Sequence, residues 1–446
     1  MPTTPTSPAR SAELHLVGAL LIAVVTLQLG CQSTGARHAA VTAPSGSSVF
    51  ARGGSEASTL SSPERAVPLG SDGAIQTTAP TTGQTRAELP PISPRDGRSK
   101  PVIAVVGVNS GTEVTDYVVP YAILSASGVA DVWALGTRPG PIPMFPALTI
   151  EPQATVGAFD ARFPRGADVV IVPAAHDDED PELLSWITTQ ANRGATIVGV
   201  CDGVWVLARA GLLSGWRAVG HWYSMGRLQN RFPETTWVRD RRYVADGHIV
   251  TTTGVTASTP VSLALVEAIA GRAKADSLAH ALGVRSWSPD HDSDHFSLSV
   301  GYVRTAAANW LAFWGREEVG IPVYEGVDEI ALALTADAYS RTYRSSARSV
   351  AATDTPVTTR RGLRILPDVV SPTLIAKMFP GEGHGTSSNP ESQEPVPVAN
   401  GDPVDYLVPM RADRPVRALD DALASIGRRY GERTAAFVAL QLEYAP

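Results

Sequence analysis

The sequence predicts an α/β fold in which a mostly parallel sheet is sandwiched by helices, followed by a degenerate, partial second copy of the same unit. Three observations support this. Buried strand patterns alternate with amphipathic helical patterns from Val102 onward, as expected when each strand is followed by a covering helix. One of these strands turns abruptly into a helix at Cys201. A later part of the chain repeats the opening order of strand, helix and strand.

The amino-acid composition and net charge limit the classes of protein to which the chain can belong. The chain has 446 residues, of which 43% are hydrophobic, and this is typical of a globular protein with two or three domains. Its formal net charge is −7, and it has neither a basic stripe nor a helix-turn-helix pattern. We therefore expect no nucleic-acid partner. We also expect no cofactor and no bound metal.

Residues 1–31 resemble an export signal. The apolar run Leu16–Leu29 is too short to span a bilayer comfortably and has the length of a signal-peptide core. It ends in a sequence that resembles the bacterial lipobox, in which Cys31 would carry the lipid, although Gln28 stands where an aliphatic residue is usual. We predict a lipoprotein of the cell envelope that faces the periplasm or the extracellular side. A signal that is cleaved elsewhere or retained, and a cytosolic protein, are the alternatives.

Residues 32–99 are rich in Ser, Thr, Pro, Gly and Ala and contain almost no aromatic residues. Such a segment buries too little apolar surface to order itself, so we predict a flexible linker. The chain contains two cysteines. If Cys31 carries lipid, Cys201 is the sole thiol of the mature chain and has no disulfide partner within it.

A folded domain is predicted over residues 100–285. Its first strand, Val102–Val108, consists of apolar residues and one glycine, as in a strand that is buried on both faces. Further strands are expected at 130–135, 148–150, 167–173, 197–200, 243–245 and 248–252. Helices are expected at 114–127, at 181–193, from 204 onward, and at about 260–270.

Cys201 stands at the joint between a buried strand and a helical pattern, with Gly199 before it and Gly203 after it. A strand that turns sharply into a helix exposes the joint residue on a strained backbone, as in the nucleophile elbow of hydrolases. The N-terminus of the following helix stabilises a thiolate and lowers the thiol pKa. The alternative is a small buried cysteine that packs a strand end.

Motifs on both sides of this joint carry a resemblance to a known family. They are Val198-Gly-Val-Cys-Asp-Gly203, Ala210-Gly-Leu-Leu213, Ala218-Val-Gly-His-Trp222, Asp246–Gly254 and Leu263–Ile269. With them, residues 101–283 resemble the DJ-1/PfpI family of the class I glutamine amidotransferase-like superfamily. The similarity is to the branch that includes isonitrile hydratase and the ligand-binding domains of AraC-type regulators. It implies a flavodoxin-like fold with a small-molecule site at Cys201.

The resemblance implies roles for three side chains. Cys201 occupies the nucleophile position. Asp116 matches an acidic residue at the start of the first helix, where a protonated carboxyl group can hydrogen-bond the thiolate; an ordinary carboxylate at a helix N-terminus is the alternative. His221 matches a histidine that acts as a base or a proton donor in several members, and a buried structural histidine is the alternative.

Two departures from the family pattern concern the same site. The family usually has two glycines whose N–H groups help form an oxyanion pocket, and this chain has Ala174 and Ala175, followed by His176. In the family, His follows the cysteine in the protease-like members and Thr follows it in the isonitrile hydratase branch. This chain has Asp202 there, and a carboxylate at that position raises the free-energy cost of ionising the thiol. We expect a related hydrolase, hydratase or glyoxalase-like activity, or a module that binds and senses a small molecule without a reaction.

A shift of 215 positions places Val108–Pro152 on Val323–Pro367 without gaps, and the stretch from Ala418 to Leu442 resembles the end of the first unit. We predict a degenerate half-domain over residues 321–370 and 415–446 that has lost the elbow, with Ala331 at the position of Asp116. Residues 286–320 would form a connecting helical region and residues 371–414 a flexible loop. The two units would then pack as an intrachain pseudo-dimer; chance similarity is the alternative.

The segment Asp290–His295 combines acidic residues with two histidines. If it were helical, His291 and His295 would lie one turn apart, a spacing that suits a metal. Asp and Ser also cap helices, and a helix is expected at about 298–313. We predict capping here.

Overall fold

The computed structural model describes residues 89–378, 395–398, 401–411 and 413–445. The predicted signal with Cys31, and residues 32–88 of the predicted linker, lie outside the described residues. Among the residues that are described, no helix has the length and apolar character needed to cross a bilayer.

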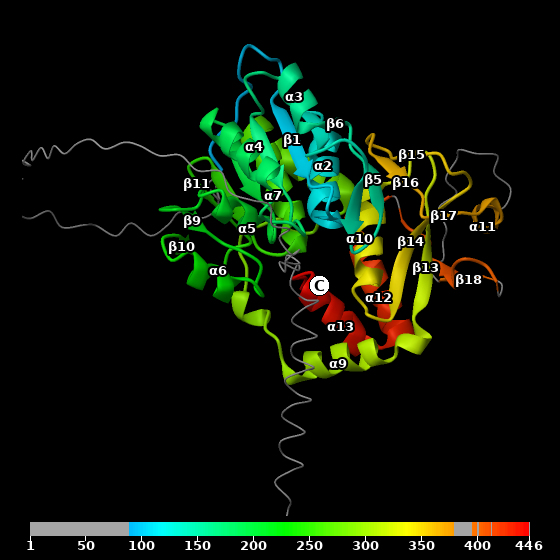
Figure 1. The fold of residues 1–446 in the computed structure, drawn as a ribbon. Helices are drawn as coiled ribbons and strands as arrows, with labels where there is room; N and C mark the ends of the chain where they lie inside the picture. The colour runs from blue at the N-terminus through cyan, green and yellow to red at the C-terminus, as the bar shows by residue number, and fades with distance from the viewer. Residues whose placement is uncertain (1–88, 379–394, 399–400, 412, 446) are drawn as a thin grey trace, which may run out of the picture. The chain divides into compact units, whose positions relative to one another are not determined.

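The first half forms a seven-stranded sheet that is parallel except for its β11–β12 hairpin (Figure 1). Its strand order is β11-β12-β8-β7-β1-β3-β6. The predicted α/β class is thereby confirmed. The strands are β1 (Val102–Gly107), β3 (Asp131–Gly136), β6 (Ala154–Thr155), β7 (Val169–Val172), β8 (Thr196–Gly199), β11 (Tyr243–Asp246) and β12 (Ile249–Thr252).

Helices cover both faces of this sheet because alternate residues of β1 face opposite cores. Ile103 and Val105 pack with α2 and α7, whereas Ala104 and Val106 pack with α3, α4 and α5. The helices are α2 (Val114–Ser127), α3 (Val156–Arg162), α4 (Pro181–Asn192), α5 (Gly203–Arg209), α6 (Met225–Arg231), η1 (Val255–Ala257), α7 (Ser258–Ala270) and α8 (Arg272–Leu282). Short strands complete this half: β2 (Thr112–Glu113), β4 (Ile142–Phe145), β5 (Thr149–Glu151), β9 (Arg217–Ala218) and β10 (Thr236–Trp237).

The second half forms a five-stranded sheet in the order β17-β14-β13-β19-β18. The segment that joins the two halves contains η2 (Ser293–His295), α9 (Val300–Leu311) and η3 (Phe313–Gly315). The strands of the second half are β13 (Glu317–Pro322), β14 (Ser345–Ala351), β15 (Val357–Thr358), β16 (Arg364–Leu366), β17 (Val369–Val370), β18 (Val396–Pro397) and β19 (Tyr406–Leu407). Its helices are α10 (Glu329–Ser340), α11 (Pro372–Met378), η4 (Pro415–Arg417), α12 (Ala418–Tyr430) and α13 (Glu432–Gln441).

The second half repeats the first in partial form. β13, α10, β16 and β17 each begin 215 residues after β1, α2, β5 and β6. The order η4-α12-α13 begins 160 residues after η1-α7-α8, so the two offsets differ by the residues that the second copy lacks. Within the described residues, no strand of the second sheet is followed by an elbow like the one after β8. β18 pairs with β19 instead, in antiparallel fashion.

Residues 89–99 do not behave as part of a flexible linker. Leu89 is buried, and the amide of Ile92 donates to the carbonyl of Ala268 at 2.9 Å. Arg95 and Arg98 both pair with Asp168, which is 4% exposed. The linker composition of this segment gave no sign of these contacts because its partners lie about seventy to one hundred and eighty residues away.

The predicted loop at 371–414 is also corrected in part. It contains α11 and β19, and β19 pairs in parallel with β13 inside the second sheet. Val404 and Leu407 are buried there. A strand of two residues is too short to show an alternating pattern, so the sequence did not reveal it.

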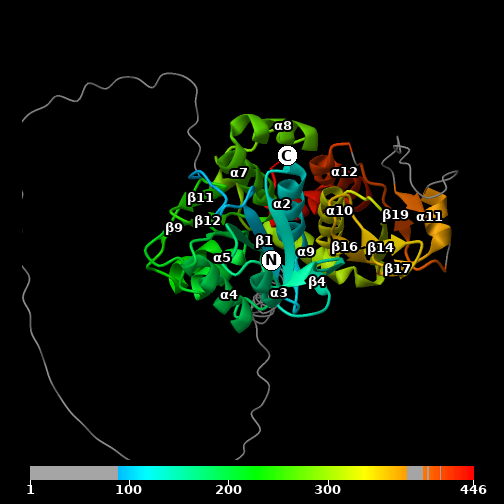
Figure 2. The ribbon, with the colours of Figure 1, turned by 90° about the horizontal axis from the view of Figure 1, so that it is seen from above.

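The contacts between the two halves include one strand pair and one helix pair. β5 and β16 are antiparallel and centred on the pair Ile150–Ile365, two residues that the 215-residue shift relates to each other. A residue that pairs with its own counterpart marks a pseudo-two-fold axis. Beside this strand pair, α2 packs against α10, as Figure 2 shows from above.

A buried ionic network lies between these two helices. Thr115 Oγ1 donates to Asp337 Oδ2 at 3.0 Å, and Arg341 pairs with both Glu113 (2.8 Å) and Asp337 (2.5 Å). The two carboxylate side chains are each 1% exposed. Burial, helped by the charges of Asp337 and Asp116, raises the pKa of Glu113 well above its ordinary value, whereas Arg341 lowers it.

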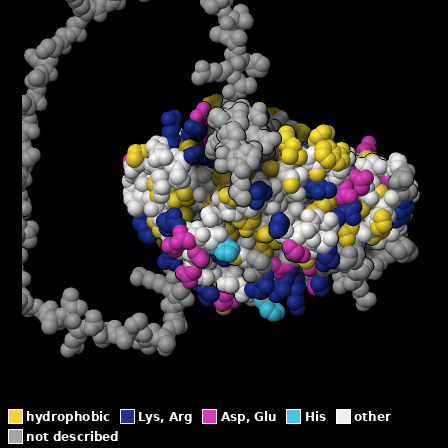
Figure 3. Space-filling model, turned by 90° about the horizontal axis from the view of Figure 1, so that it is seen from below, with side chains coloured by type: hydrophobic (Ala, Val, Ile, Leu, Met, Phe, Trp, Pro, Cys, Tyr) yellow, Lys and Arg dark blue, Asp and Glu magenta, His cyan; other side chains and the backbone are white. Residues whose placement is uncertain are grey.

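Apolar side chains are exposed on α9 and η3. Trp310, Leu311, Phe313 and Trp314 are all exposed, Trp314 to 79%. Figure 3 shows hydrophobic side chains gathered on the face seen from below, the side on which α9 lies in Figure 1. The connecting segment therefore presents a cluster of large apolar side chains at the surface.

Replacing Arg341 by Met should lower the free energy of unfolding at pH 7 by about 3–5 kcal/mol, because two buried carboxylates lose their counter-ion. The deficit should shrink as the pH falls, since protonation of Glu113 removes charge that the variant no longer balances. Urea denaturation at several pH values measures both effects. Arg348→Met, which removes an exposed partner of Glu318, is the control and should change stability by about 1 kcal/mol or less. Equal losses in the two variants would contradict the network's role.

Candidate functional site

The joint after β8 has the geometry of a strained elbow. Cys201 has φ +54°, a left-handed conformation that is rare outside glycine. Its amide donates to Thr252 Oγ1 at 3.0 Å, and the amide of Val200 donates to the carbonyl of Val172 at 2.9 Å. Bonds to strands on both sides of β8 therefore hold the elbow.

Gly203 lets the helix after the elbow start against the end of β7. A Cβ atom at this position would lie 2.0 Å from the carbonyl oxygen of Val172 and 3.0 Å from that of Pro173. Only glycine permits this approach. The helix that follows, α5, has seven residues, so it is about two turns long.

Cys201 is the one cysteine in the described part of the chain, and its residue is only 5% exposed. Its position at the carboxyl end of a central parallel strand is where open α/β sheets bind ligands. The thiol therefore lies in the expected place in the fold, but beneath the surface.

Asp116 lies in the first turn of α2 and is fully buried. Its Oδ2 accepts a hydrogen bond from the amide of Ala174 at 3.3 Å, whereas Oδ1 is buried without a hydrogen-bond partner in the described structure. Burial raises the pKa of Asp116 well above its ordinary value; Asp337 and Asp202 raise it further, and the Ala174 amide and Arg341 oppose the shift. These influences favour the protonated carboxyl group that the sequence analysis expected.

Asp202 adds negative charge next to the thiol. It is 6% exposed and, among the described residues, it forms no side-chain cap on α5 and its Oδ1 is buried without a hydrogen-bond partner. Burial is the main cause of the raised pKa values of Asp178 and Tyr223, and the charge of Asp202 raises both further. Because Asp202 directly follows Cys201 in the chain, a charged carboxylate there opposes ionisation of the thiol.

Residues 174–176, where the resemblance places an oxyanion pocket, make several contacts within the protein. The Ala174 amide is directed at Asp116, and Ala175 forms an isolated bridge with Thr112. The amide of His176 donates to the carbonyl of Gly111, and its ring stacks on Phe145 with centroids 4.0 Å apart. Burial lowers the pKa of His176. The Ala174 amide is thus engaged within the protein instead of awaiting a substrate oxygen.

His221 faces the C-terminal segment of the second half. It is 6% exposed, and its Nε2 lies 3.3 Å from the carbonyl oxygen of Gln441 and 4.0 Å from Glu443 Oε2. It adjoins the loop after β12, because a Cβ atom on Gly254 would lie 2.7 Å from the His221 ring. This loop follows Thr252, the last residue of β12, whose Oγ1 accepts the Cys201 amide.

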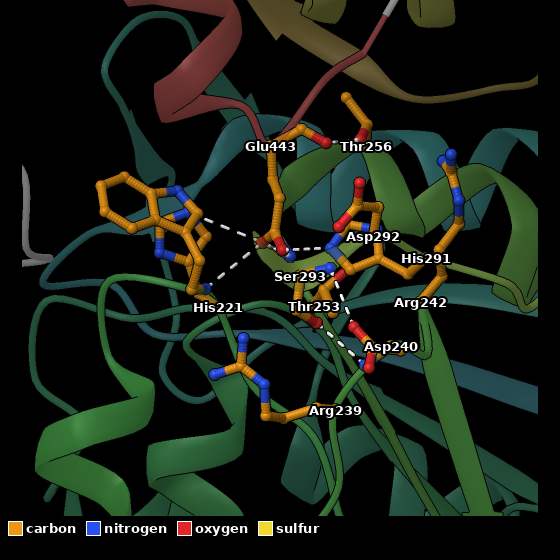
Figure 4. Close-up of polar contacts among 12 residues, drawn as sticks. His221, Arg239, Asp240, Arg242, Thr253, Thr256, His291, Asp292, Ser293 and Glu443 are labelled. Carbon is orange, nitrogen blue, oxygen red and sulfur yellow. Dashed lines mark hydrogen bonds and ion pairs between the residues drawn. The ribbon is translucent and has the colours of Figure 1, made fainter. Parts of the chain in front are cut away.

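Glu443 joins these segments (Figure 4). Its Oε2 accepts from the amides of Gly254 at 2.6 Å and Trp222 at 3.4 Å, and its Oε1 lies 2.8 Å from His291 Nε2. The residue is 3% exposed. The second half therefore places a carboxylate between His221 and His291.

No sequence motif predicted a role for Glu443, although the repeat contained a signal. Glu443 corresponds to Gly283, the left-handed residue that ends α8, and it adopts φ +54° itself. Glycine is favoured at such a left-handed helix end, so a glutamate there destabilises the backbone locally. This strain indicates that the glutamate side chain has another role.

The histidine cluster also needs correction. η2 covers only Ser293–His295, so His291 and His295 do not lie one α-helical turn apart. Asp292 caps η2 and Ser299 caps α9, as the capping interpretation expected. His291 instead pairs with Glu443 and stacks on Phe296. The described residues contain no group of three metal-ligating side chains.

Residues 102–268 match the DJ-1/PfpI family. The HTH-type transcriptional regulator CdhR of Pseudomonas aeruginosa is 30% identical over 122 residues, which are 27% of this chain and 36% of that protein. Isonitrile hydratase of Pseudomonas putida is 34% identical over 110 residues, which are 23% of this chain and 46% of that protein. The chain therefore spans less than half the length of either relative.

Solved structures of the same family are also similar. A ThiJ/PfpI family protein from Pseudomonas syringae is 25% identical, with a TM-score of 0.40 over 50% of this chain and 93% of that one. DJ-1beta of Drosophila melanogaster is 20% identical, with a TM-score of 0.38 over 42% of this chain and all of that one.

Replacing Gly203 by Ala should destabilise the protein by about 4 kcal/mol or more, because the new Cβ atom overlaps the Val172 carbonyl and forces the elbow apart. Gly157→Ala is the matched control. Gly157 lies exposed in α3 with no atom closer than 3.9 Å to an added Cβ, so this change should stabilise or leave stability within about 1 kcal/mol. Chemical denaturation compares the two, and a small effect at residue 203 would contradict the close packing.

Proposed function

Because residues 102–268 belong to the DJ-1/PfpI family, we propose that the first half of this chain is a small-molecule enzyme with Cys201 as its nucleophile. The observation that carries the proposal is the left-handed backbone of Cys201. Such strain costs about 1–3 kcal/mol and persists at functional sites, where the surrounding structure enforces it. Hydrogen bonds to Thr252 and Val172 provide that enforcement here.

Asp116 is the second member of the proposed site. Its buried carboxyl group, with a raised pKa and one oxygen without a partner in the described structure, is suited to donate a hydrogen bond to a thiolate. Such a bond favours the ionised sulfur. It would offset the opposing charge of Asp202.

The proposed chemistry begins with addition of Cys201 Sγ to an electrophilic carbon of the substrate. A carbon–sulfur bond forms, one π bond of the substrate opens, and the proton lost by the thiol goes to the substrate heteroatom. Hydrolysis, hydration and glyoxalase-like isomerisation share this first step. His221 is the proposed proton carrier, and Glu443 and the Gln441 carbonyl orient its ring.

A second candidate function is binding and sensing of a small molecule without a reaction. The observation that favours it is the buried acidic surroundings of Cys201, together with the Ala174 amide that is directed at Asp116. Both disfavour an anionic intermediate. Two relatives named as HTH-type transcriptional regulators are 30% and 34% identical over 27% and 20% of this chain.

Alkylation by iodoacetamide across pH, followed by peptide mapping at Cys201, separates the two candidates. The enzyme proposal expects an apparent thiol pKa below the ordinary value of about 8.5. Asp116→Ala should raise it and slow labelling at pH 7 by about tenfold, since each pKa unit changes the thiolate fraction tenfold. Asp354→Ala, at an exposed aspartate, is the control and should change neither.

Turnover provides the companion measurement. Cys201→Ala should abolish product formation in a screen of α-oxoaldehydes, isonitriles and amides. An ordinary thiol pKa that Asp116→Ala leaves unchanged, with tight ligand binding that survives Cys201→Ala, would reject the enzyme and favour the sensing module.

We also propose that the protein is lipid-anchored at the cell envelope, on the basis of residues 1–31 alone. In cells that process lipoproteins, the chain should partition into the detergent phase of a Triton X-114 extract. Cys31→Ser should move it to the aqueous phase, because one acyl-bearing residue is lost. Cys201→Ser is the control and should not change the partition. Aqueous partition of the unaltered chain would refute the anchor.

A further inference from the structure

A cavity of about 350 Å³ lies between the two halves. One wall consists of η1, the start of α7 and residues 283–286 from the first half. The other wall consists of η4, the start of α12 and residues 444–445 from the second half. A volume of this size is in the range that small-molecule sites occupy. Cys201, Asp116 and His221 are not among its lining residues.

The walls are counterparts in the repeat. Thr259 and Leu419 are 160 residues apart and face the cavity from opposite sides, as do Val284 and Tyr444. The cavity therefore lies on the pseudo-two-fold axis. A symmetric dimer would line such a space with identical walls, but in a single chain the walls can diverge and suit one asymmetric ligand.

The cavity carries excess positive charge. Arg242 Nε donates to the carbonyl of Asp290 at 3.2 Å, and Arg417 Nε donates to the carbonyl of Gly283 at 3.3 Å. Neither guanidinium has a carboxylate at ion-pair distance in the part of the chain that the structure describes. Arg285, which also lines the cavity, differs from them because Asp420 pairs with it at 3.1 Å.

The surroundings of Arg242 also favour the binding of an anion in this cavity. It is only partly exposed, and burial lowers its pKa, whereas the charges of Glu443 and Tyr444 oppose that shift. A buried cation gains most from a counter-ion that binds beside it. α7 and α12 also begin at the cavity wall, and neither has a side-chain N-cap. Their positive ends face the same space.

Apolar side chains also line the cavity. Val255, Leu334 and Leu419 line it together with Val284 and Val416. Thr256, another lining residue, donates its Oγ1 hydroxyl to the main-chain carbonyl of Glu443 at 2.8 Å (Figure 4). An occupant that matches these surroundings has one anionic group and a compact apolar body.

We propose that this cavity is a second small-molecule site, distinct from the one at Cys201, and that it binds a small carboxylate with an apolar body. Arg242 and Arg417 bind the carboxylate group. The apolar body packs against Val255, Leu334 and Leu419.

Titration of the full chain with benzoate, benzyl alcohol and benzylammonium, followed by ligand-observed NMR, tests the proposal. The three probes share a ring and differ in charge. Benzoate should bind about tenfold or more tightly than benzyl alcohol, and benzylammonium should bind most weakly. Arg242→Met and Arg417→Met should each weaken benzoate binding about tenfold and leave benzyl alcohol binding nearly unchanged.

Two controls locate the site. Arg304→Met, at an exposed arginine of α9, and Cys201→Ala should both retain full benzoate affinity. The proposal is overturned if benzoate binds no better than benzyl alcohol or does not bind. It is also overturned if both cavity variants keep the affinity while their thermal midpoints show that they fold, or if Cys201→Ala abolishes binding. The last outcome would place the carboxylate at the elbow and would not by itself disprove the nucleophile.

Discussion

The contact between α2 and α10 is the interaction on which the rest of the structure depends. Both helices are buried along most of their length, so neither half could stand alone without exposing a long apolar surface. The charged groups within this contact are tolerated because Arg341 lies between Glu113 and Asp337. Glu113 also accepts the amide of Asp116 at 2.7 Å. The carboxylate that joins the halves thus fixes the first turn of the helix that carries the site.

The second half completes the first instead of duplicating it. It has kept the elements that pack against the first half and lacks an elbow of its own in the described residues. Its C-terminal segment contributes the Gln441 carbonyl and the Glu443 carboxylate to the surroundings of His221. A fused pair frees one copy from the need to conserve its own site, so its residues can serve the site of the other.

The chemistry at the elbow depends on two opposing influences. The enforced backbone of Cys201 and the protonated state favoured for Asp116 promote a reactive sulfur. Burial of the thiol and the charge of Asp202 oppose it. Whether Cys201 acts as a nucleophile or only lines the pocket therefore depends on the balance between Asp116, whose neutral form is favoured, and Asp202, whose charge opposes the thiolate. This balance also separates the two functions proposed above.

The sequence by itself determined the elements with local patterns. α2 and α4, the elbow at Cys201 and the 215-residue repeat were all predictable, because hydrophobic periodicity and glycine spacing are properties of neighbouring residues. Only the tertiary structure decided the placement of β19, the packing of residues 89–99 and the pairing of Glu443 with His291. These features join segments that lie about seventy to one hundred and eighty residues apart. Local periodicity does not predict a contact with a residue at that separation, so only the folded structure shows these contacts.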